Sequence, residues 1–205
     1  MNKESDSSHE SIIIGSFSRF IEFCNEWFVL SRWIFKSEKR MFLKLEVMMI
    51  ISTILCIGIL LNIEFFPYFV GLIISILLIQ RVIEFLIVYS RNFIFGRGRI
   101  FSHFHDTEKR GQWLLLMFTL NVLQISIIFA IWYRFLSLWV KDAFITPLST
   151  LDSFYFSIVT FLTVGYGDII PVAPITKWLV IAQSILIFYI IVIVINGLIS
   201  MHFKK

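Results

Sequence analysis

The chain has 205 residues, of which 58% are hydrophobic and 16% are charged. Soluble domains average about 45–50% apolar and about 25% charged residues, so this chain is too apolar for one soluble core. Its net charge is +4, and the basic residues cluster between apolar runs. That pattern is typical of membrane topology signals and excludes a reading of the charge as a nucleic-acid surface. The composition predicts a multi-pass protein of the cell membrane, with no nucleic-acid partner.

The segment ahead of the first apolar run is first polar and then amphipathic. Residues 1–16 are predicted to be a disordered cytoplasmic N-terminus. Residues 17–44 form the next region, in which apolar side chains recur at helical spacing between 17 and 35 opposite a polar face with Arg19 and Glu22. This periodicity predicts an interfacial amphipathic helix. The alternative is a helix that packs against the protein's own assembly.

Four apolar stretches are long enough to cross a bilayer, which takes about 20 residues. They cover residues 45–63, 67–89, 113–135 and 175–201. We expect 45–90 to form a pair of transmembrane helices, 91–112 to be a cytoplasmic linker, and 113–205 to form the functional domain. His103 and His105 in the linker favour a solvated loop over a metal site, because a structural zinc normally needs four ligands.

The basic residues predict the orientation of the spans. Lysines and arginines are dense before the first span and between the second and third, and two lysines follow the fourth. The opposite connections carry fewer: Arg134, Lys141 and Lys177. Because positive loops stay on the cytoplasmic side, both termini and the linker are predicted to be cytoplasmic. The same clusters predict contacts with membrane lipids, anionic ones in particular.

The string TVGYGD at residues 163–168 carries the chemistry. A cation that enters a narrow pore loses its water, and rings of backbone carbonyls from several copies of one strand can replace it. The carbonyls of Thr163, Val164, Gly165 and Tyr166 are the candidate ligands, with the Thr163 hydroxyl as an innermost ring. Carbonyls that point the same way need residues tolerant of positive φ, which explains Gly165 and Gly167. The side chains of Val164 and Tyr166 are then expected to pack outward.

A short helix is predicted directly before this string. Residues 151–162 are apolar but too few to cross a bilayer. Asp152 or Ser153 is the expected N-cap. The C-terminal end of such a helix carries partial negative charge, which favours a cation at the inner end of the strand.

Together these features resemble the tetrameric potassium channels, which have a pore helix, a TVGYG filter and an inner helix. The resemblance covers residues 113–201, and SIVTFLTVGYGDIIP at 157–171 is similar to the family pattern throughout. It implies that K⁺ binds along residues 163–167, without any other cofactor. One strand is a quarter of a carbonyl cage, so a fourfold homotetramer follows.

The resemblance also implies roles for residues beside the filter. Asp168 is expected to bond to an aromatic residue of the pore helix, and Tyr155 stands at that position. Val159 and Thr160 are expected to support the filter from the pore helix. Some family members carry a Glu where this chain has Val159, so gating that depends on that Glu is not expected here.

Candidate gating residues lie in the fourth and second spans. Ile187 occupies the place of the family's midpoint glycine, whereas Gly197, next to Asn196, comes about two to three turns later. Gly197 serves either as a lower hinge or as a small packing contact. Arg81 and Glu84 share a helix face, where they act in gating or pack as a structural ion pair. A voltage-sensing helix carries arginines at every third position, and the second span has only Arg81 at that spacing. We therefore do not expect this span to sense voltage.

Several polar side chains inside the spans are candidates for hydrogen bonds between helices. They are Asn121, Gln124, Gln183 and Ser184. Gln183 is also a candidate for the cavity below the filter.

The sequence therefore predicts an all-α membrane protein with four transmembrane helices, a re-entrant pore helix and a selectivity filter. As a homotetramer it would conduct K⁺ passively and would not be an enzyme. A less selective cation channel, a secondary transporter and a non-conducting modulatory subunit are the alternatives. The intact TVGYG disfavours the first, and transporters of this kind carry four filter-like segments in one chain. The first helix pair is a scaffold or a regulatory unit. The sequence leaves open whether an unidentified regulatory subunit also takes part.

Overall fold

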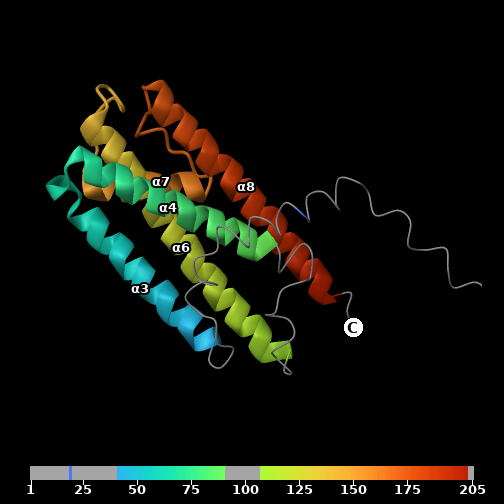
Figure 1. Ribbon diagram of the computed structural model, residues 1–205. Helices are drawn as coiled ribbons and strands as arrows, with labels where there is room; N and C mark the ends of the chain where they lie inside the picture. The colour runs from blue at the N-terminus through green and yellow to red at the C-terminus, as the bar shows by residue number, and fades with distance from the viewer. Residues whose placement is uncertain (1–18, 20–40, 91–106, 203–205) are drawn as a thin grey trace, which may run out of the picture.

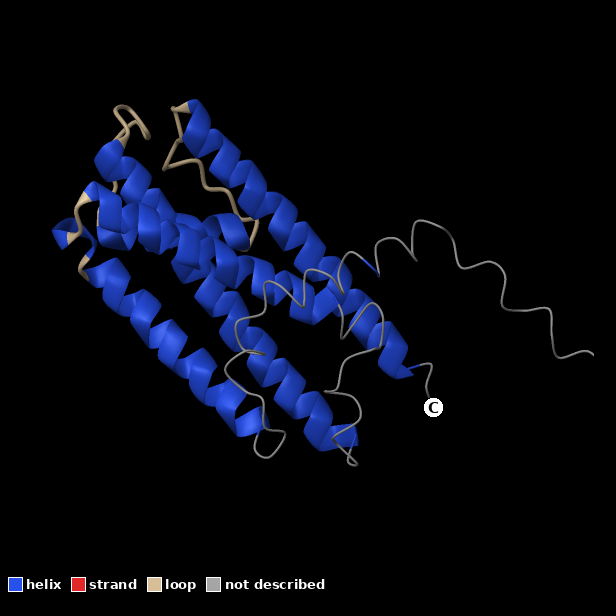
Figure 2. Ribbon diagram, in the orientation of Figure 1, coloured by secondary structure: helices blue, strands red, loops and turns tan. Residues whose placement is uncertain are grey.

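The computed structural model describes residues 41–90 and 107–202, together with Arg19. The predicted N-terminal segment, the amphipathic helix apart from Arg19, and the linker histidines lie outside these residues. The described chain is helical, with no strand over its length and a single isolated bridge between Phe144 and Pro171 (Figure 2). The prediction of an all-α protein is thereby confirmed for this part of the chain.

Five α-helices and one 3-10 turn follow one another along the described residues. They are α3 (Met41–Leu61), η1 (Ile63–Phe65), α4 (Tyr68–Tyr89), α6 (Thr107–Trp139), α7 (Thr150–Phe161) and α8 (Pro174–His202). Figure 1 shows α3, α4, α6 and α8 as long rods. The short helix α7 lies toward one end of the bundle, and the loops before and after α7 are at that same end. The helix α7 contacts both α6 and α8.

Three helices are long and apolar enough to cross a membrane. Their apolar parts are Tyr68–Ile87, Leu115–Trp139 and Pro174–Val192. In α3 the apolar part that qualifies is shorter, Val47–Leu61. By length and composition α4, α6 and α8 are thus capable of crossing a membrane, and the fourth span stays a prediction.

The helix α6 is longer than the span predicted from hydropathy. It begins at Thr107, inside the predicted linker, because no proline separates the charged residues from the apolar run that follows. It ends at Trp139, shortly before Asp142 adopts a left-handed φ of 54°. A left-handed residue just past a helix stops the chain from continuing as a helix.

The core of the protein lies on both sides of α6, which contacts every other helix named above. One apolar cluster joins α6 to α3 and α4 and includes Leu60, Leu78 and Ile131. The other joins α6 to α7 and α8 and includes Phe156 and Leu186. The helix pair α3–α4 and the pair α7–α8 are therefore held together mainly through α6.

A buried arginine ties three segments together at the loop end of the bundle. Arg134 of α6 forms an ion pair with Glu64 of η1 and donates to the Leu148 carbonyl. Beside it, the Ser137 hydroxyl accepts from the Leu148 N–H at 2.8 Å. A buried charge is tolerated when it is paired and hydrogen-bonded. Arg134 thus fixes the α3–α4 turn and the residues just before α7 to the same point of α6.

The ion pair predicted in the second span is present. Arg81 and Glu84 of α4 lie 2.7 Å apart, and the Glu84 side chain is buried. The Arg81 guanidinium also contacts the sulfur of Met49 in α3. The pair therefore faces α3, and its part in gating stays a prediction.

Gly71 allows α4 and α6 to approach closely. A Cβ on Gly71 would lie 1.8 Å from the ring atom Cη2 of Trp139. The Trp139 ring cannot easily turn away, because it stacks on Phe135 at 4.2 Å and meets the edge of Tyr68 at 5.1 Å.

We expect Gly71→Ala to lower the free energy of unfolding by about 1–3 kcal/mol, the usual cost of an extra methyl in a packed contact. The measurement is thermal unfolding of the purified protein in detergent. Gly58→Ala in α3 is the matched control, because its Cβ would meet nothing within 4 Å. The control should keep or slightly raise the midpoint, since alanine is the better helix former. Equal midpoints for the two variants would contradict the packing account.

Candidate functional site

The short helix α7 starts earlier than predicted. Its N-cap is Ser149, whose hydroxyl accepts from the Asp152 N–H at 3.1 Å, while the Asp152 carboxylate accepts from the Ser149 N–H at 3.0 Å. The prediction of Asp152 or Ser153 as the cap was wrong. A capping box satisfies two backbone donors reciprocally, which makes Ser149 the better start. Ser153 is instead buried and donates to the Ser149 carbonyl at 2.8 Å.

Residues 163–167 form an extended segment that pairs with no other described strand; we call it the TVGYG strand, and its backbone alternates in handedness. Thr163, Gly165 and Gly167 have φ of 56°, 60° and 77°, and Val164 and Tyr166 between them are not left-handed. In an ordinary strand, successive residues point to opposite faces. Turning every second residue into the left-handed region lets successive peptide groups face the same side. This is the backbone that a row of carbonyl ligands requires.

The left-handed Thr163 was not foreseen from the sequence. A left-handed φ costs a residue with a side chain about 1–3 kcal/mol. Two hydrogen bonds hold it there: its N–H donates to the Thr160 carbonyl at 3.0 Å, and its hydroxyl donates to the Leu162 carbonyl at 2.7 Å. The next residue, Val164, donates its N–H to the Val159 carbonyl at 3.0 Å. Val159 and Thr160 therefore contact the start of the strand through their backbone carbonyls.

Two further contacts anchor the outer end of the strand to α7. Asp168 raises the pKa of the Tyr155 side chain, because its carboxylate lies near the Tyr155 hydroxyl and favours the protonated form. The Tyr155 ring also lies parallel to that of Tyr166, with ring centres 6.5 Å apart and an interplanar angle of 2°. The sequence resemblance implied that Tyr155 and Asp168 pair, and a hydrogen bond between them stays a prediction.

The segment after the strand is held on its other side by the α6–α7 connection. Ile145 donates to the Ile170 carbonyl at 3.2 Å, and Val172 donates to the Ala143 carbonyl at 2.9 Å. These bonds surround the bridge between Phe144 and Pro171. The TVGYG strand thus lies between α7 and residues 170–172, which are themselves hydrogen-bonded to the α6–α7 connection.

The strand is open on one side in a single chain. Residues 162–168 are exposed, with 48% of Val164 and 70% of Tyr166 accessible. The Tyr166 ring lies parallel to that of Tyr155 but remains more exposed than Val164, so neither side chain is packed away in a single chain. Non-helical backbone at membrane depth must be buried in protein or line a water-filled path. The exposed face of this strand therefore requires a neighbour, an aqueous path, or both.

The predicted gating residues of α8 lie in one continuous helix. Asn196 and Gly197 both fall within α8, but their side chains lie outside the described residues. A hinge at Gly197 stays a prediction. Ile187, at the place of the family's midpoint glycine, is buried. Gln183 is a sequence candidate for the cavity below the filter. In the structure it is instead completely buried against α6 and α7, where it forms hydrogen bonds.

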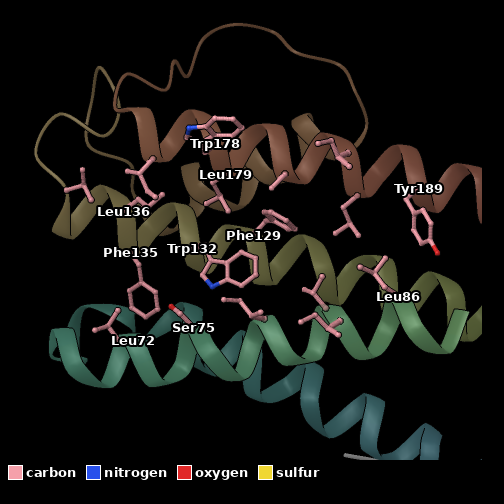
Figure 3. A pocket seen from close by; sticks show the side chains of 18 of the residues that line it. Leu72, Ser75, Leu86, Phe129, Trp132, Phe135, Leu136, Trp178, Leu179 and Tyr189 are labelled. Atoms are coloured by element: carbon pink, nitrogen blue, oxygen red, sulfur yellow. The ribbon is translucent and has the colours of Figure 1, made fainter. Parts of the chain in front are cut away.

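A separate groove of about 1360 Å³ lies between α4 and α8, with α6 as its floor (Figure 3). Apolar and aromatic side chains line it, among them Trp132, Leu136 and Trp178. The Ser90 and Tyr189 hydroxyls hydrogen-bond to each other and so join α4 to α8. No charged residue lines the groove, and none of its lining residues belongs to the TVGYG strand.

Residues 117–204 match a family described as ion channel. Over 78 residues, the chain is 40% identical to two-pore potassium channel 4 of Arabidopsis thaliana. The matched stretch covers 37% of this chain and 26% of that relative. No solved structure matches the chain. The chain therefore spans about a quarter of the length of its curated relative.

These similarities indicate the class of protein: residues 117–204 are similar to a family of ion channels. They also support the resemblance stated above, because 78 residues of the chain are similar to part of a plant potassium channel.

The capping box makes the start of α7 sensitive to acid. Hydrogen bonds from the Ser149 side chain and backbone hold the pKa of the Asp152 carboxyl below its ordinary value. A lowered pKa means that the carboxylate stabilises the folded protein above the unfolded pKa. That stabilisation is lost as the pH falls through the lowered, folded value.

We expect Ser149→Ala to reduce the free energy of unfolding at neutral pH by about 1 kcal/mol, the usual cost of a lost cap. The variant should also lose less stability than the wild type on acidification. Thermal unfolding in detergent at neutral and acidic pH measures both effects. Ser184→Ala is the control, because this exposed hydroxyl bonds to the Val180 carbonyl of its own helix at 2.9 Å. An unchanged pH dependence in Ser149→Ala would refute the assignment.

Proposed function

We propose that this protein is the pore-forming subunit of a potassium-selective channel, through which K⁺ moves passively across the membrane. The observation that carries the proposal is the alternating backbone of the TVGYG strand, with left-handed φ at Thr163, Gly165 and Gly167. In the proposed pore, the carbonyls of Thr163, Val164, Gly165 and Tyr166 replace the water shell of K⁺. No catalytic step is part of this function.

The position of α7 supports a cation at the inner end of the strand. The helix ends at Phe161, and its last carbonyls, at Val159 and Thr160, accept hydrogen bonds from the strand. The C-terminal end of a helix carries partial negative charge, which stabilises a cation nearby. The same end both fixes the strand and favours an ion next to it.

The open side of the strand supports a fourfold assembly. One chain offers one row of carbonyls, and a closed ring requires several rows around an axis. Large apolar side chains of α8 are also exposed in the single chain, including Trp178, Ile185 and Phe188. In the proposed homotetramer these side chains face neighbouring subunits or lipid, and α3 is the fourth span. Both termini then lie in the cytoplasm, as the basic clusters predict.

The relative supports the choice of ion. The plant protein that matches part of this chain is named a potassium channel, and the match covers about a quarter of its length. The activity of the whole protein, its selectivity and any regulatory subunit are therefore proposals for this chain.

The proposal is tested by K⁺ and Na⁺ flux into liposomes that contain the purified protein. We expect K⁺ flux well above Na⁺ flux, with block by barium. Gly165→Ala should abolish the selective flux, because Gly165 has a φ of +60° and a side chain there is strained. Nothing lies within 4 Å of the added methyl in a single chain, so the loss would report on the backbone and not on a clash within the subunit.

Gly58→Ala is the matched control and should retain the wild-type flux, since its Cβ also meets open space. Equal K⁺ and Na⁺ flux in the wild type would point to a less selective cation channel. Absence of any flux would point to a non-conducting subunit. Either result would refute the proposed function.

The fourfold assembly is tested separately by light scattering of the detergent-solubilised protein during size-exclusion chromatography. We expect a protein mass of four chains after subtraction of the detergent. A monomer or dimer as the stable species would contradict the proposed ring, because one strand per chain cannot then enclose the ion.

A further inference from the structure

A buried polar network joins α6, α7 and α8 behind the TVGYG strand. The Tyr133 hydroxyl of α6 donates to Gln183 Oε1 of α8 at 2.5 Å, and Gln183 Nε2 donates to the Ser157 carbonyl of α7 at 3.0 Å. The Ser157 hydroxyl in turn donates to the Ser126 carbonyl of α6 at 2.7 Å. Tyr133, Ser157 and Gln183 are all fully buried. One amide therefore connects three helices.

The Gln183 amide supplies both the donor and the acceptor that this connection needs. The Ser157 carbonyl can only accept, so it must face the NH₂ group of Gln183, which leaves the amide oxygen for the Tyr133 hydroxyl. An apolar side chain at position 183 would leave the buried Tyr133 hydroxyl without this partner, and the Ser157 carbonyl would keep only its bond within α7. A buried polar group without a partner is costly, so the three residues depend on one another.

The network reaches the strand through the last turns of α7. Ser157 lies two positions before Val159, whose carbonyl accepts from the Val164 N–H of the strand. A displacement of α8 must either break the bond from Gln183 or carry the Ser157 carbonyl with it. In the second case the end of α7 moves, and with it the carbonyl that holds Val164.

We propose that Gln183 is a positioning residue that couples α8 to α7 and thereby keeps the TVGYG strand in its ion-binding conformation. This inference rests on the proposed function, because it assigns a role within the same site. Gln183 touches no ion and acts through Ser157 and the end of α7. A shift of α8 would therefore change how well the strand binds K⁺.

The chain offers a matched control for this role. Gln124 of α6 is a second buried glutamine, and its Nε2 donates to the Ser52 hydroxyl of α3 at 2.8 Å. It too joins two helices through an amide, but it faces α3 and makes no contact of this kind with α7. Replacing Gln124 with leucine removes the same chemical group on the side of α6 away from the strand.

The experiment compares thermal unfolding of the purified, detergent-solubilised protein in K⁺ and in Na⁺, together with the K⁺/Na⁺ flux ratio in liposomes. K⁺ should raise the wild-type midpoint relative to Na⁺, because a bound ligand stabilises the folded protein. In Gln183→Leu the flux ratio should fall about fivefold to tenfold, since each of two interhelical hydrogen bonds in a membrane protein contributes about a factor of three. The extra stability in K⁺ should shrink as well.

Gln124→Leu should lower the midpoint equally in both ions and leave the flux ratio unchanged. Tyr133→Phe removes one hydroxyl and keeps the packing, so it serves if Gln183→Leu does not fold; its flux ratio should fall about threefold. If the Tyr133 and Gln183 variants keep the wild-type dependence on K⁺, or if Gln124→Leu loses it to the same extent, the network is only structural and the inference is overturned. A wild type without any K⁺ dependence would overturn the proposed function and this inference together.

Discussion

The proposed function depends on keeping a non-helical strand ordered at membrane depth. Such backbone has no water to satisfy it unless it lines an aqueous path, so protein groups must supply its partners. The TVGYG strand is held at its start by the carbonyls of Val159 and Thr160, and near its end the Tyr166 ring lies against that of Tyr155. The remaining carbonyls are left for a ligand. A helix that ends beside the strand, and a return segment bonded to a neighbouring loop, are the supports that this demands.

The strand is supported by α7, and α7 is in turn positioned by its packing against α6. This helix carries an apolar cluster on each side, one toward α3 and α4 and one toward α7 and α8. Arg134 at its end binds both the turn of the first helix pair and the residues just before α7. The first helix pair is thereby attached to the same helix that positions α7. Its packing agrees with a scaffold, and the Ser90–Tyr189 contact gives it a direct link to α8 as well.

Apolar packing and polar contacts have different roles between the helices. Most of the surface between α4 and α8 is apolar and leaves an open groove, which fixes no unique register between the two helices. The buried hydrogen bonds of Tyr133, Gln183 and Ser157 do fix one, because their donors and acceptors match in a single arrangement. Specific positioning near the strand thus comes from a few polar atoms in an apolar core.

The sequence by itself determined the membrane class, the order of the helices and the position of the strand, because hydropathy, glycine placement and the TVGYGD string are local signals. It also indicated the pairing of Tyr155 with Asp168, through a family resemblance. Only the tertiary structure decided that Ser149 caps α7, that Thr163 is left-handed, and that Gln183 joins α6 and α7. Each of these depends on which groups compete for one donor or acceptor in space, and partners far apart in sequence leave no local pattern.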